Sequence, residues 1–199
     1  MKRTVRKFYT LIEIMTVIVI AAILFGIGIP AFTTMIQGSN MTVAIRQLSA
    51  KIQAARAYAV TNRCKVAVLL PNVVENSSGT KKDDCCFSAY RVCIVDSTKT
   101  FQEWIEDENW KNMPSGIYRE SVSHTTNVTV DATDIGGKET GYPAIIFDSK
   151  GKLVDAGGNP EIILRHGRYV GGKIPTGGTD HKLTVNQYSG KVTVTVPES

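Results

Sequence analysis

The feature that most constrains this chain is an apolar run near its N-terminus. No charged residue occurs from Ile14 to Ile36, and a helix of about 20 apolar residues crosses a bilayer. The run is preceded by basic residues with no acid among them, namely Lys2, Arg3, Arg6 and Lys7. Because Lys and Arg accumulate on the cytoplasmic side, we expect a membrane-spanning helix with a cytoplasmic N-terminus and an extracytoplasmic C-terminal region.

The apolar run continues without a break signal into an amphipathic segment. A secretory signal peptide would have a shorter apolar core followed by a small-residue cleavage site, so the sequence favours one long helix. Beyond the run, an apolar stripe at helical spacing indicates a face that packs on a domain; it comprises Ile45, Leu48, Ile52, Ala55 and Ala59. We therefore divide the helix into residues 9–36 and an amphipathic part, 37–62.

Glu13 stands at the start of the apolar run and has two interpretations. A carboxylate at mid-bilayer costs about 2.5 to 3.5 kcal/mol on insertion scales, so such a residue usually has a partner or a role. Alternatively, Thr10 and Glu13 fit a capping box, in which Glu13 favours the helix N-terminus.

The segment Tyr9-Thr10-Leu11-Ile12-Glu13 with its apolar helix resembles the signal of type IV pilins and type II secretion pseudopilins. The resemblance implies a leader of residues 1–8, a prepilin peptidase that cuts between Phe8 and Tyr9, and N-methylation of Tyr9. It also implies that Glu13 pairs with a neighbouring subunit's N-terminal amine, and that Pro30 is the helix-kinking proline. The family has Gly where this chain has Phe8, so an uncleaved, membrane-anchored chain is the alternative.

The remaining residues, 63–199, predict an extracytoplasmic β-rich domain, which makes the fold class α+β with a long helix packed on an antiparallel sheet. Strands are expected at 65–70, 89–95, 127–132, 144–148, 161–165, 182–187 and 191–196, separated by turn residues. Several segments resemble the GspH/FimT family of minor pseudopilins and minor pilins: 48–70, 110–117, 145–151 and 185–192.

Four cysteines follow the apolar run, in a region where export would allow disulfides. A bond between the adjacent Cys85 and Cys86 would be strained, so we expect Cys64 and Cys93 each to pair with one of them. Buried free thiols are the alternative. No CxxC spacing occurs and the three histidines show no ligand-like spacing, so we expect no metal and no cofactor.

No catalytic signature occurs in the sequence, and we expect a structural subunit rather than an enzyme. The resemblance implies a minor pseudopilin that packs with other subunits in a type II secretion pseudopilus. The alternative is a minor type IV pilin that binds DNA in natural transformation. The net charge of only +5 argues weakly for DNA, and a basic groove would have to come from Arg165, His166, Arg168, Lys173 and Lys182.

Overall fold

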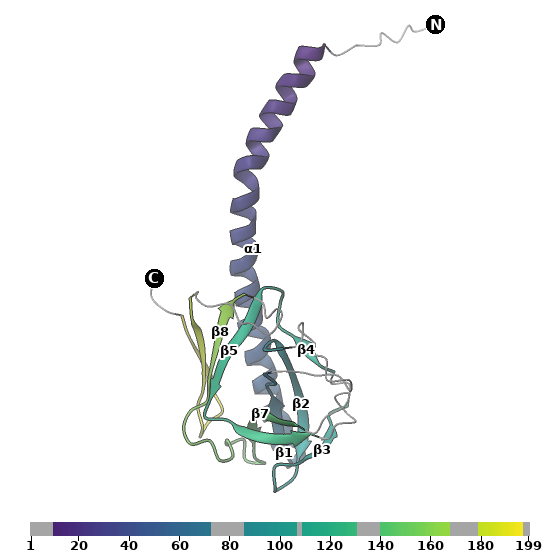
Figure 1. Cartoon of the computed structure of the whole chain (residues 1–199). Helices are drawn as coiled ribbons and strands as arrows, with labels where there is room; N and C mark the ends of the chain where they lie inside the picture. Colours follow the sequence, from purple (N-terminus) through teal and green to yellow (C-terminus); the bar gives the residue numbers. More distant parts are fainter. Residues whose placement is uncertain (1–9, 73–85, 107–108, 131–139, 168–178, 197–199) are drawn as a thin grey trace, which may run out of the picture. The chain divides into compact units, whose positions relative to one another are not determined.

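The computed structural model describes residues 10–72, 86–106, 109–130, 140–167 and 179–196 (Figure 1), with side chains for all of these except residues 27–38 and 140. The chain divides into two compact units, Met1–Ser39 and Asn40–Ser199. Helix α1, Leu11–Asn62, contributes its N-terminal part to the first unit and its C-terminal part to the second. The helix ends where the sequence predicts.

The C-terminal part of α1 is the centre of the second unit. One stripe of it is buried, comprising Met41, Ala44, Leu48, Ile52, Ala55 and Ala59. Their spacing of three and four residues places them on one helix face. The predicted stripe is therefore confirmed from Leu48 onward, whereas Ile45 is only partly buried and packs beside it.

Two antiparallel sheets flank this part of α1 (Figure 1). The first has the order β3-β2-β1-β7-β6, with β4 paired to β2, and the second has the order β10-β9-β8-β5. The strands are β1 Lys65–Leu69, β2 Ala89–Val95, β3 Phe101–Trp104, β4 Lys111–Asn112, β5 Ile117–Ser123, β6 Thr126–Val130, β7 Thr140–Phe147, β8 Glu161–His166, β9 His181–Val185 and β10 Val192–Thr195. The α+β class with antiparallel sheets is thus confirmed, and the expected single sheet is two.

The first sheet is buried on both faces. In and just after β1, Val66, Val68 and Leu70 join the α1 stripe in the main core. The alternate residues Ala67 and Leu69 belong to a second cluster on the opposite face. Successive side chains of a strand point to opposite faces, so β1 reads as a continuous apolar run because both faces are covered.

Each of the seven expected strands is present, with ends shifted by a few residues except for β2, which matches at both ends. The sequence did not indicate β3, β4 or β5. Strand β5 reads Ile-Tyr-Arg-Glu-Ser-Val-Ser and lacks a simple apolar alternation. A register irregularity between Arg119 and Ser121, where it pairs with β8, breaks the period of two.

Candidate functional site

The first turn of α1 is capped by Thr10. The Glu13 N–H donates to Thr10 Oγ1 at 3.3 Å and to the Thr10 carbonyl oxygen at 3.1 Å. Thr10 is therefore the N-cap residue and Glu13 the third helical residue, as a capping box requires. The Glu13 side chain is exposed. The structure thus supplies the Thr10 half of the capping box and leaves the Glu13 carboxylate accessible to a partner.

Beyond this cap, the helix exposes large apolar side chains on all sides. Exposed fractions range from 52% at Ile14 to 77% at Leu11. The set comprises Leu11, Ile12, Ile14, Met15, Val17, Ile18, Val19, Ile20, Ile23, Leu24 and Phe25. Since four successive positions such as 17–20 surround a helix of 3.6 residues per turn, no face is polar. Exposed apolar surfaces of this extent mark sites of contact with membranes or other proteins.

Three residues of the predicted prepilin signal and helix, Phe8, Tyr9 and Pro30, have no described side chain. Phe8 and Tyr9 lie outside the described residues, and so does the side chain of Pro30, where the backbone belongs to α1. Within the part of the chain that carries described side chains, which leaves out 27–38, no helix is long and apolar enough to cross a membrane.

The predicted disulfides are not confirmed. Among the described cysteines, Cys64, Cys86 and Cys93 form no disulfide, and Cys85 lies outside the described residues. Cys93 belongs to the second core cluster, whereas Cys64 packs against the main core on the other face of the first sheet. Burial raises the pKa of the Cys93 thiol to about 12. The structure therefore matches the alternative of buried thiols for Cys93.

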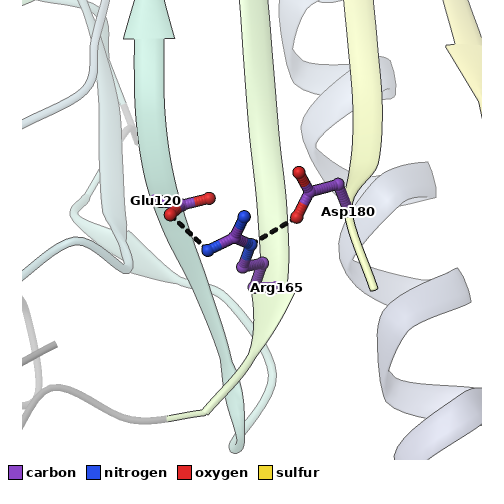
Figure 2. Close-up of polar contacts among 3 residues, drawn as sticks. All are labelled: Glu120, Arg165 and Asp180. Carbon is purple, nitrogen blue, oxygen red and sulfur yellow. Dashed lines mark hydrogen bonds and ion pairs between the residues drawn. The ribbon is translucent and has the colours of Figure 1, made fainter. Parts of the chain in front are cut away.

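Two of the cations that a basic DNA-binding groove would need, Arg165 and Lys182, are paired with carboxylates. Arg165 on β8 donates from Nη1 to Glu120 on β5 and from Nε to Asp180, which precedes β9 (Figure 2). The hydrogen bond from Arg165 lowers the pKa of the Asp180 carboxyl. Lys182 forms an ion pair of 2.9 Å with Glu161. Arg168 and Lys173 lie outside the described residues.

The structure brings together two histidines that are distant in the sequence. Pairing of β8 with β9 places the His166 and His181 rings edge to face, with centroids 6.4 Å apart. Burial and the neighbouring His166 lower the pKa of His181. Within the described ranges, no group of three or more His, Cys, Asp or Glu side chains could hold a metal ion. The pair is invisible in the sequence because strand pairing alone creates it.

Arg119 is a buried cation that sequence reasoning missed. Its side chain has no exposed surface, and its Nη2 donates to the carbonyl oxygens of Leu70 at 2.8 Å and Pro71 at 2.7 Å. It also donates to Asn72 Oδ1 at 3.1 Å. Burial lowers the pKa of the guanidinium to about 9, which leaves it protonated at neutral pH. Arg119 therefore ties the chain that follows β1 to strand β5.

Comparison with known proteins finds distant structural likeness. No protein-family model and no curated protein sequence matches the chain. The chain is similar to the minor pseudopilin EpsH of the type II secretion system of Vibrio cholerae, at 11% identity and a TM-score of 0.44, covering 79% of this chain and 98% of that one. It is also similar to the type IV minor pilin FimU of Pseudomonas aeruginosa, at 12% identity and a TM-score of 0.44, covering 79% and 87%. Likeness at this level carries no inference about function.

Proposed function

We propose that this chain is a structural minor pseudopilin, a subunit of the pseudopilus of a type II secretion system. The observation that carries the proposal is the apolar surface around α1 from Leu11 to Phe25, which is exposed on every side. In water such a surface is costly, at roughly 25 cal/mol per Å². The inner membrane covers it before assembly, and the helices of neighbouring subunits cover it in the filament.

The segment at the helix start supports assembly rather than simple anchoring. Tyr9 to Glu13 resembles the prepilin signal, which implies a prepilin peptidase as partner, cleavage after Phe8 and methylation at Tyr9. The exposed Glu13 carboxylate then pairs with the N-terminal amine of a neighbouring subunit. In a core without water this pair matters most, because leaving one charge there unpartnered is strongly unfavourable.

In this proposal the second unit, Asn40–Ser199, is extracytoplasmic and makes lateral contacts with other subunits. The role is structural, without catalysis and without a cofactor. A minor type IV pilin is the second candidate, because the Tyr9–Glu13 signal is common to pilins and pseudopilins. The pairing of Arg165 and Lys182 with carboxylates counts against DNA capture, whether the chain is a minor pseudopilin or a minor type IV pilin.

A comparison of Glu13 variants tests the assembly mechanism. Glu13→Gln removes the charge while a Gln at this position can still close a capping box. We expect normal membrane insertion and impaired incorporation into filaments, measured by membrane fractionation and by cross-linking in sheared filaments. Thr10→Ala is the matched control, since it removes the cap, at about 1 kcal/mol, and keeps the carboxylate. Incorporation of Glu13→Gln at the level of the unmodified chain would show that Glu13 serves only as a capping residue.

Two further measurements address processing and the cellular system. Mass spectrometry of the native protein should find a chain that begins at N-methylated Tyr9, whereas an intact N-terminus would contradict the assembly mechanism. Deletion of the gene should abolish export of secreted proteins. If pili are lost while export continues, the minor type IV pilin is the correct assignment.

A further inference from the structure

Strand β10 forms an open edge of the second sheet. It is the last strand in the order β10-β9-β8-β5, and no described strand pairs with its outer side. Thr193, Val194 and Thr195 are all exposed, with 39% of Val194 accessible, and the following Val196 is 57% accessible. An exposed strand edge presents unpaired N–H and C=O groups that can pair with another chain.

The other sheet edges carry features that discourage such pairing. Strand β3 is short and contains Glu103. Strand β5 carries Glu120 at its register irregularity, and β6 is joined to the residue before β3 by a bridge between Thr129 and Thr100. Charges, bulges and covered edges are the usual means of blocking edge-to-edge association. From Val192 to Val196 the chain has only valine and threonine, which favour strands.

The hydrogen-bond pattern shows which backbone groups of β10 face outward. Asn186 donates to the Lys191 carbonyl oxygen at 2.9 Å, so these opposite residues form a hydrogen-bonded pair. Such pairs alternate along an antiparallel ladder. Thr193 and Thr195 therefore direct their backbone groups toward β9. The backbone groups of Val192, Val194 and Val196 point away from it.

The segment Val-Thr-Val-Thr-Val reads the same in both directions. If two copies pair antiparallel about Val194, then Val194 lies opposite Val194 of the second copy, and Val192 lies opposite Val196. In both pairs the backbone N–H and C=O groups face away from β9, as hydrogen bonding between the two copies requires. A pair centred on Thr193 keeps the same hydrogen-bond phase, because Val192 would then lie opposite Val194, but it leaves Val196 opposite Gly190. Ladder phase therefore allows the register about Val194, and sequence symmetry selects it, because only this register places each of the three valines opposite another valine of the segment.

We propose that β10 is a self-association edge, where a second copy of this chain adds its own β10 in antiparallel register about Val194. The interface is isologous, as in a two-fold dimer. Val192 packs against the main core, and the alternation of side chains puts Val194 on the same sheet face. The second copy thus covers the exposed Val194 and extends the apolar face of the sheet. This inference does not depend on the proposed role in secretion.

Cysteine cross-linking tests the register in the full-length chain in detergent micelles. Thr193 and Thr195 of the two copies would form non-hydrogen-bonded pairs with Cα atoms about 4.5 Å apart, within the disulfide range, whereas diagonal pairs lie about 7 to 8 Å apart. A mixture of T193C and T195C chains should therefore cross-link on mild oxidation at least fivefold more than either variant alone. The unmodified chain, which keeps its native cysteines, gives the background. Equal cross-linking in all samples would overturn the proposal.

Substitution at the centre of the strand tests the edge itself. Val194→Pro removes an outward N–H and leaves the ladder to β9 intact, since proline is tolerated where its missing N–H faces solvent. We expect at least a tenfold weaker dimer by analytical ultracentrifugation, with unchanged circular dichroism, while Val194→Ile associates like the unmodified chain. A Val194→Pro chain that dimerises normally would place the contact elsewhere, for example in α1. An unmodified chain that stays monomeric at all concentrations would equally overturn the proposal.

Discussion

Arg56 on α1 donates a hydrogen bond from its Nε to the carbonyl oxygen of Gly151 at 3.1 Å. The turn that holds Gly190 packs against the same Arg56 side chain. The carbonyl oxygen of Gly190 accepts a hydrogen bond from Gln53 Nε2 at 3.1 Å. One helix face therefore holds two turns that are far apart in the sequence. Both glycines have positive φ, +74° at Gly151 and +63° at Gly190.

Gly190→Ala should destabilise the second unit. A Cβ at this position would lie 2.5 Å from Arg56 Cδ and 3.1 Å from Phe147 Cε1. The cost is backbone strain plus displacement of Arg56, together about 2 to 4 kcal/mol, measured by urea unfolding. Gly116→Ala is the control, because Gly116 has φ of +81° and no atom near its missing Cβ. Gly116→Ala should cost only the backbone strain, about 1 kcal/mol. If both variants lose the same free energy of unfolding, the contact with Arg56 contributes nothing to the cost at Gly190.

Arg119→Met should also destabilise the protein. The methionine fills much of the volume but leaves the Leu70 and Pro71 carbonyl oxygens without their buried donor. We expect a loss of about 1 to 3 kcal/mol in the free energy of unfolding, read from urea denaturation. Lys152→Met, at an exposed side chain, is the control and should change little. An increase in stability would show instead that burial of the Arg119 charge dominates.

The unmodified protein should not bind DNA measurably in low salt, because the carboxylates of Glu120 and Asp180 hold the guanidinium of Arg165. The Glu120→Gln and Asp180→Asn double variant frees this cation and removes two nearby negative charges. We expect weak binding in electrophoretic mobility assays that disappears as salt rises. Binding by the unmodified protein would revive the DNA-binding alternative. Adding Arg165→Met to the double variant should abolish the gain.

Cys93 should resist alkylation by iodoacetamide at pH 8 in the native protein. The thiolate is the reactive form, and burial both raises the pKa of this thiol to about 12 and blocks access. Mass spectrometry of peptides should show modification of Cys93 only after unfolding, with no need for a reductant. If Cys93 becomes reactive only once a reductant is added to the unfolded protein, the predicted disulfide exists.

Local patterns predicted much of the fold. The stripe containing Leu48, Ile52 and Ala55 predicts the buried face of α1, because helical geometry fixes which residues share a face. The last hairpin was equally readable, since the turn residues Ser189 and Gly190 separate two segments that were expected to be strands. Strand β5 was missed because its pattern is interrupted at Arg119, whose acceptors come from the chain after β1.

The sequence by itself determined that this chain has an apolar helix bearing Glu13 in its first turn, and that strands and turns follow that helix. These features depend on residues close in the chain, which is why spacing reveals them. Only the tertiary structure decided that Arg165 is held by Glu120 and Asp180, and that no strand among the described residues pairs with the outer side of β10. Both follow from the order in which strands pair, and that order depends on contacts between residues far apart in the sequence.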